Sequence, residues 1–157
     1  MDHNYILGFI FSMISSVGFS VLFSCPKKSI FWGGITGAIG WTIYSFIKNM
    51  SQGMYIATLL GAYVTGIIGE VFARKFHMPA SLFIIPGIIN LVPGAGIYYT
   101  LFYFVNDQMN MGMIKLFQTL AIAGAISFGV LLASASSSSL RKFKFRKPTK
   151  KYDWKIK

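Results

Sequence analysis

Five apolar runs of membrane-spanning length follow one another along this chain and leave room for few kinds of fold. They cover residues 5–23, 30–47, 54–72, 80–105 and 116–135. About 20 consecutive apolar residues cross the hydrocarbon core of a bilayer. Only 12% of the 157 residues are charged, whereas about a quarter are charged in a typical soluble domain. The sequence therefore predicts an all-α integral membrane protein, with a five-helix transmembrane bundle in residues 1–135.

The positions of the basic residues predict the orientation of this bundle. With five crossings, all of the 15 Lys and Arg residues except Lys48 and Lys115 lie on the side of the C-terminus. Basic residues accumulate on the cytoplasmic side of membrane proteins. We therefore expect a multi-pass protein of the cell membrane with its N-terminus outside and its C-terminus in the cytoplasm. The N-terminal flank MDHNY has no Lys or Arg, which predicts a retained first helix and not a cleaved signal peptide.

Motifs for catalysis or metal binding are not apparent in the sequence. Cys25 is the single cysteine, and His3 and His77 lack the spacing of metal ligands. No Ser/His/Asp set or pair of carboxylates lies at a predicted membrane face. We therefore expect neither an enzyme nor a metal or cofactor.

The fourth apolar run contains two Pro-Gly pairs, in the stretch PGIINLVPGAG of residues 86–96. Pro86 and Pro93 lack an amide hydrogen, so each should leave one carbonyl of the preceding turn, that of Leu82 or Ile89, without its helical donor. The intervening glycines permit backbone angles that a helix does not use. The pattern predicts a fourth helix that is discontinuous at both Pro-Gly pairs.

Irregular backbone at membrane depth persists only where it is buried in protein or lines a wet cavity. Broken helices of this kind form substrate sites in transporters, although a kink that serves only packing is the alternative. We expect the freed carbonyls and Asn90 to contact substrate donors, and the half-helix that begins after Gly96 to face a carboxylate. The candidate substrate-binding residues are Pro86, Gly87, Asn90, Pro93, Gly94, Gly96 and Thr100.

Glu70 is the only carboxylate within a predicted span. An acid at membrane depth is costly, which suggests a role in substrate contact or proton coupling. Arg74 follows four residues later, in the order that favours a helical salt bridge, so a structural ion pair is the alternative. Glu70 shares a helix face with Gly66 and Ala62 and is expected to point toward protein.

Small residues recur at every fourth position of the third and fifth runs. Membrane helices associate by close packing at such residues, either within a bundle or against another subunit, and both uses stay open here. The two stripes are Ala57, Gly61, Thr65 and Gly69, and Ala121, Ala125, Gly129 and Ala133.

Two stretches of the sequence together resemble the threonine/serine exporter family. They are GEVFARKFHMPASLFIIPGIINLVPGAGIYYT, residues 69–100, and GFSVLFSCPKKSIFWGGITGAIGW, residues 18–41. The likeness covers roughly residues 5–135 and is strongest to the short, single-module type that forms the small subunit of a split exporter. Asn90 stands where this motif frequently has proline.

This resemblance implies a secondary exporter of small polar metabolites, either threonine/serine-type amino acids or small dicarboxylates. It also implies a partner, a larger membrane subunit that carries the other module. A non-transporting scaffold or assembly subunit for a partner membrane protein is the alternative function.

Residues 136–157 are predicted to form a Ser-rich linker and a basic cytoplasmic tail. The run SASSSS, residues 134–139, has the composition of a flexible exit from the fifth helix. Because the basic residues directly follow a membrane helix, we expect them to bind anionic lipid headgroups and not nucleic acid. The candidate lipid-binding residues are Arg141, Lys142, Lys144, Arg146 and Lys147.

Overall fold

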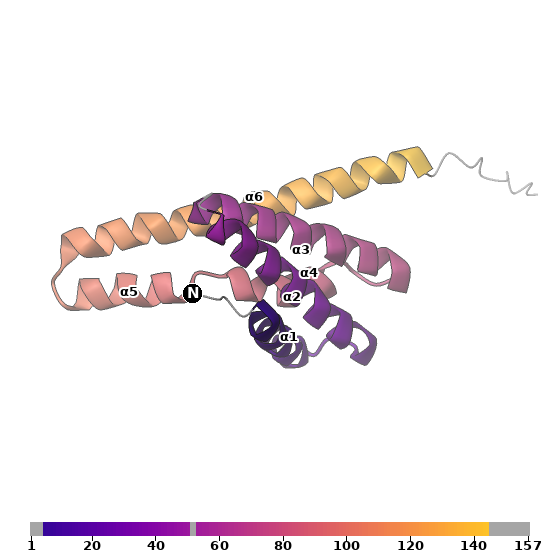
Figure 1. Cartoon of the computed structure of the whole chain (residues 1–157), viewed down its shortest axis with the longest axis horizontal. Coiled ribbons are helices and arrows are strands. Elements are labelled where there is room, and N and C mark those ends of the chain that lie inside the picture. The colour runs from indigo at the N-terminus through magenta and orange to yellow at the C-terminus, as the bar shows by residue number, and fades with distance from the viewer. Residues whose placement is uncertain (1–4, 51–52, 145–157) are drawn as a thin grey trace, which may run out of the picture.

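The computed structural model describes residues 5–50 and 53–144, with side chains described up to residue 137. Every element in these ranges is helical (Figure 1). The elements are α1 (Tyr5–Leu22), α2 (Lys27–Asn49), α3 (Met54–Phe76), α4 (Ser81–Ile88), the short 3-10 helix η1 (Ile89–Leu91), α5 (Gly94–Val105) and α6 (Met109–Lys144).

Four helices, α1, α2, α3 and α6, are each long and apolar enough to cross a membrane. The segments Ser81–Leu91 and Gly94–Val105 pass the same test together but are bent by 52°. The described residues therefore provide four spans, or five if the bent pair counts as one. The predicted all-α membrane bundle with a discontinuous fourth helix is confirmed.

Small and polar residues make the closest contacts between helices, and a few large apolar side chains, such as the fully buried Phe83, pack among them. A Cβ atom added at Gly37 of α2 would collide with the Ser16 side chain of α1. One added at Gly40 would collide with Thr65 of α3. Large apolar side chains such as Ile14 instead cover the outside of the bundle. This inside-out distribution is expected where lipid is the solvent, because lipid gives apolar side chains no reason to gather inside.

The two predicted stripes of small residues differ in their use. All four residues of the α3 stripe are buried. On α6, Gly129 and Ala133 lie against α3, but Ala121 is exposed. The first helix carries a third stripe that we did not predict, the buried serines Ser12, Ser16 and Ser20.

The serine run of residues 134–139 is helical, so the predicted flexible exit is wrong at this position. The Ser136 hydroxyl hydrogen-bonds within the helix, donating to the Leu132 carbonyl at 2.7 Å. Ser134 and Ser137 also hydrogen-bond to Glu70 of α3. Contacts to a neighbouring helix thus hold a run whose composition alone suggests a linker.

The sixth helix begins at Met109, well before the predicted start of the fifth span at residue 116. Its N-terminal half pairs with α5 in a hairpin that extends away from the other helices (Figure 1). Glycines allow this pairing, because a Cβ at Gly96 would lie 2.5 Å from the Thr119 hydroxyl and one at Gly112 would lie 2.5 Å from the Phe104 ring. The C-terminal half of α6 packs on α3.

Candidate functional site

The break in the fourth helix occurs once, at Val92 and Pro93, and not at both Pro-Gly pairs. Pro86 lies inside α4 without interrupting it. Val92 is extended, with φ −62° and ψ 130°, the conformation that a following proline favours. Pro93 has φ −78° and ψ 59°, and the Gly94 amide donates to the Val92 carbonyl at 2.8 Å across it. The chain therefore turns sharply around Pro93 before α5 begins.

The two carbonyls that were expected to be free for substrate are both occupied or covered. The Ile89 carbonyl accepts a hydrogen bond from the Val92 amide at 3.3 Å. The Leu82 carbonyl faces α2, where a Cβ added at Gly33 would lie 3.6 Å from its oxygen. Turn formation therefore uses one acceptor position of the Ile89 carbonyl, and α2 partly covers the Leu82 carbonyl, while substrate binding by either carbonyl stays a prediction.

The glycines near the break serve close packing and not unusual backbone angles. Neither Gly87 nor Gly96 has a positive φ, contrary to expectation. A Cβ at Gly87 would lie 2.8 Å from Thr65 and 3.1 Å from Thr36, so α4 fits closely between α3 and α2. The second half-helix starts at Gly94, three residues before the predicted start after Gly96.

Asn90 joins the break to α1. Its side-chain Nδ2 donates to the Ser12 carbonyl at 3.0 Å and to the Ser16 hydroxyl at 2.8 Å. Both bonds use Nδ2, which leaves the Oδ1 of Asn90 to accept a hydrogen bond from another molecule. The amide therefore fixes η1 on the serine stripe of α1 and retains one acceptor.

An open pocket lies beside Asn90, between α1, α2 and η1. It has a volume of about 290 Å³ and is lined by Gly8, Phe11, Ser12, Trp41 and Asn90. The Ser12 side chain is only 6% exposed, and its hydroxyl makes no hydrogen bond to any residue in the described ranges. The pocket thus combines two apolar walls with a hydroxyl and an amide, and none of its lining residues is charged.

The structure separates the residues of the predicted site into three places. Asn90 lines the pocket, and Pro86 and Gly87 are buried against the neighbouring helices α2 and α3. The remaining four, Pro93, Gly94, Gly96 and Thr100, lie at the turn or along α5, where Gly96 and the buried Thr100 belong to the hairpin with α6. Thr100 donates its hydroxyl to the Gly96 carbonyl at 2.7 Å.

Four of the five residues lining the pocket were missed by sequence reasoning: Gly8, Phe11, Ser12 and Trp41. One signal for them was available in the first apolar run. Serines at positions 12, 16 and 20 recur every fourth residue and define one helix face. A polar face on an otherwise apolar membrane helix points toward protein or water and not toward lipid.

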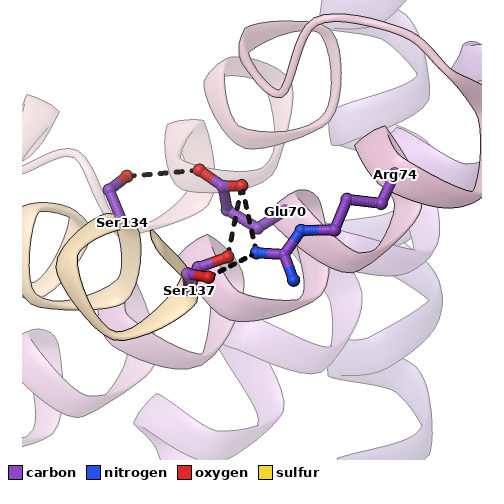
Figure 2. A network of polar contacts seen from close by, with 4 residues as sticks. All are labelled: Glu70, Arg74, Ser134 and Ser137. Carbon is purple, nitrogen blue, oxygen red and sulfur yellow. Dashed lines mark hydrogen bonds and ion pairs between the residues drawn. The ribbon is translucent and has the colours of Figure 1, made fainter. Parts of the chain in front are cut away.

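A second polar cluster joins α3 to α6 and is centred on Glu70 (Figure 2). Oε2 of Glu70 lies 3.7 Å from Nη2 of Arg74 and accepts a hydrogen bond from the Ser137 hydroxyl at 3.3 Å. Oε1 accepts from the Ser134 hydroxyl at 3.5 Å, and Arg74 Nη2 donates to the Ser137 carbonyl at 3.0 Å. Glu70 therefore points toward protein, as predicted, and the predicted pair with Arg74 is formed.

The Glu70 cluster and the Asn90 pocket share no residue and lie on different helix pairs. In the described part of the chain, no group of three or more His, Cys, Asp or Glu side chains lies close enough together to hold a metal ion. The two polar features are thus a neutral pocket at the helix break and an ion-paired cluster between α3 and α6.

Comparisons with known proteins identify a family for most of this chain. Residues 8–136 match the family model described as "Threonine/Serine exporter, ThrE". No solved structure matches the chain.

Three curated relatives share the matched region. The chain is 28% identical over 129 residues to a threonine/serine exporter of Corynebacterium glutamicum, which covers 82% of this chain and 26% of that protein. It is 25% identical over 129 residues to a probable threonine/serine exporter of Mycobacterium tuberculosis, covering 82% of this chain and 24% of that protein. It is 27% identical over 131 residues to an uncharacterized protein of Haemophilus influenzae, which covers 78% of this chain and 44% of that protein.

The chain thus spans between about a quarter and less than half of the length of these relatives. The family match, in contrast, extends over most of this chain, from the pocket residue Gly8 to Ser136, which hydrogen-bonds to Tyr63 of α3. With its apolar helices and its single broken span, this chain is a membrane protein that belongs to the threonine/serine exporter family.

Proposed function

We propose that this chain is the small membrane subunit of a secondary exporter of small polar metabolites, either threonine/serine-type amino acids or small dicarboxylates. The transport step requires a larger membrane subunit that carries the other module. The relatives named as exporters support this arrangement, because each is about four times as long as the region that this chain matches.

The observation that carries the proposal is the pocket beside Asn90. Its volume of about 290 Å³ is at the small end of the roughly 300–1,000 Å³ of small-molecule sites, which suits a metabolite of few atoms. The Oδ1 of Asn90 would accept from a substrate hydroxyl or ammonium, and the Ser12 hydroxyl would donate to a carboxylate or hydroxyl. Phe11 and Trp41 would exclude water from the apolar part of the substrate.

The test is efflux of labelled serine, threonine and a dicarboxylate panel from cells that express both subunits. Asn90→Leu should lower efflux, because it removes the acceptor from the pocket. Asn49→Leu is the matched control, since Asn49 lies exposed at the end of α2 and bonds to the Tyr5 hydroxyl outside the pocket. Normal efflux from Asn90→Leu, at equal expression and assembly, would favour the alternative of a non-transporting scaffold.

We also propose that the C-terminal tail binds anionic lipids on the cytoplasmic face. Arg141, Lys142 and Lys144 fall in the last turns of α6, whereas Arg146 and Lys147 lie outside the described residues. Each basic residue near an anionic leaflet contributes about 1 kcal/mol. A chain that ends at residue 140 should retain less labelled phosphatidylglycerol in detergent than the full chain, and equal retention would contradict this role.

A further inference from the structure

The hairpin of α5 and the first half of α6 extends beyond the rest of the molecule with little cover (Figure 1). Because Ala62 lies against Gly129 and Gly66 against Ala133, the start of α3 at Met54 is level with about residue 121 of α6. The first dozen residues of α6, and α5 beside them, therefore project roughly 18 Å beyond α3 at 1.5 Å per residue.

The outer face of α5 is apolar along its whole length. This face consists of Gly94, Ala95, Tyr98, Phe102 and Val105, all of them exposed. The Val105 side chain is 83% exposed and that of Tyr98 is 62% exposed. The opposite side of α5, which includes Thr100, is the one packed on α6.

Lipid alone cannot cover this hairpin and the rest of the bundle together. The 23 residues of α3 are about 34 Å long and extend over about 32 Å at the average helix tilt of about 20°. They already fill the hydrocarbon core, which is about 30 Å thick, so the projecting hairpin adds its length beyond that core. A bilayer that covers α3 therefore leaves the apolar end of the hairpin outside the lipid.

The outer face of α1 differs from that of α5, because α1 is an uninterrupted helix of 18 residues that fits within the lipid core at about 27 Å.

From these observations we infer that the outer face of α5 is the docking surface for the larger membrane subunit. The occupant is a protein with an apolar helical surface that covers this face of α5. The inference rests on the proposed function in one respect, that a larger subunit exists. The relatives supply the reason for choosing it over a second copy, since they carry at least as much additional chain in the same polypeptide.

Photo-cross-linking tests this surface directly. The full chain is co-expressed with the membrane protein from the same cell that matches the part of the exporters not covered here. A benzoylphenylalanine in place of Tyr98 should cross-link to that protein, whereas the same group in place of Ile14 on α1 should not. Both side chains are 62% exposed, so the two positions are equally accessible in the isolated chain.

A second measurement uses two glycines that both have open space for a side chain within this chain. A Cβ atom added at Gly94 or at Gly18 of α1 meets no atom within 4 Å, and both residues are exposed. Gly94→Leu should reduce co-purification of the larger subunit by about tenfold or more, as expected when a packed contact is overfilled, whereas Gly18→Leu should not.

Equal cross-linking from both positions, or unchanged co-purification of Gly94→Leu, would overturn the assignment of this surface. Cross-linking of Tyr98 only to a second copy of this chain would also overturn it, in favour of a homo-oligomer. These outcomes are separate from the efflux test of Asn90→Leu. A docking failure with intact dependence on Asn90 would leave the transport proposal standing, and the reverse result would leave the docking surface standing.

Discussion

At the scale of single residues, close contact between helices decides which substitutions this protein tolerates. Gly124 and Gly129 lie on the same helix, α6, but face different surroundings. A Cβ added at Gly129 would lie 2.5 Å from the Leu59 carbonyl oxygen and 3.0 Å from the Tyr63 amide nitrogen. One added at Gly124 would meet no atom within 4 Å. The backbone atoms near Gly129 cannot move aside as a flexible side chain would.

We therefore predict opposite effects for the two alanine substitutions. Gly129→Ala should destabilise the protein by about 1–3 kcal/mol through overpacking. Gly124→Ala should be neutral or stabilise it by up to about 1 kcal/mol, because alanine favours the helix over glycine. Thermal unfolding of the purified variants in detergent measures both effects. A larger loss for Gly124→Ala than for Gly129→Ala would show that the α3–α6 contact differs from the one described.

The charge of Glu70 at membrane depth suggests a role in substrate contact or proton coupling, whereas its contacts suggest a structural ion pair. Its carboxylate is already paired with Arg74 and accepts bonds from Ser134 and Ser137 (Figure 2). Glu70→Gln keeps an acceptor for the serines and removes only the charge. Since Arg74 is 44% exposed, loss of the ion pair should cost less than about 1 kcal/mol.

We expect Glu70→Gln to retain most of the efflux, because the cluster is separate from the pocket and its charge is locally balanced. The measurement is efflux at matched expression, with Glu70→Leu as a variant that also removes the acceptor. A complete loss of efflux in Glu70→Gln, with normal stability and assembly, would instead assign Glu70 to proton or substrate coupling.

At the scale of elements, the two prolines of the fourth span have different consequences. Pro93 stands at the turn that separates η1 from α5, and Pro86 lies inside α4. The Ile89 carbonyl accepts from the Val92 amide, three residues on. An amide at position 93 could instead make the α-helical bond to this carbonyl and extend the helix. An amide at position 86 would only add a bond within a helix that is already formed.

We predict that Pro93→Ala straightens the span, displaces Asn90 from the serine stripe of α1 and lowers efflux strongly. Pro86→Ala should preserve efflux, and the double variant should behave like Pro93→Ala. Expression and co-purification of the larger subunit serve as controls for insertion and assembly. Normal efflux in the double variant would reduce both prolines to packing features and remove the pocket from the transport route.

At the scale of the whole molecule, the orientation in the membrane remains a prediction from the basic residues. In a Cys25→Ser background, an impermeant maleimide should label cysteines placed at Asn49 and Asp107 of intact cells. It should not label cysteines placed at Lys28 or Lys144. Labelling at Lys144 from outside would contradict the cytoplasmic C-terminus.

The native thiol provides a control for this experiment. Burial raises the pKa of Cys25, in the loop between α1 and α2, by disfavouring the charged thiolate. Less thiolate is then present at neutral pH, so Cys25 should react more slowly than an exposed cysteine even in opened cells.

The class of the protein, the approximate helix positions and the place of the break could all be predicted from local sequence. Apolar runs of membrane length and the missing amide hydrogen of Pro93 are local properties. Their effect on helix formation does not depend on which distant residues pack nearby. The resemblance at residues 69–100 likewise needed only contiguous sequence, and the family match confirmed it. The same local reasoning wrongly predicted a helix break at Pro86. The helix α4 continues through this proline, and the Leu82 carbonyl, which loses its helical donor, packs against α2.

Which side chains contact one another could be seen only in the packed helices. Asn90 reaches Ser16 across 74 positions of sequence, and Ser137 reaches Glu70 across 67. Composition alone assigned the serine run of α6 to a linker, but hydrogen bonds to α3 make it helical. The pocket, the Glu70 cluster and the projecting hairpin all arise from how helices approach one another at small residues. That approach depends on distant parts of the chain at once, which is why no single stretch of the sequence reveals it.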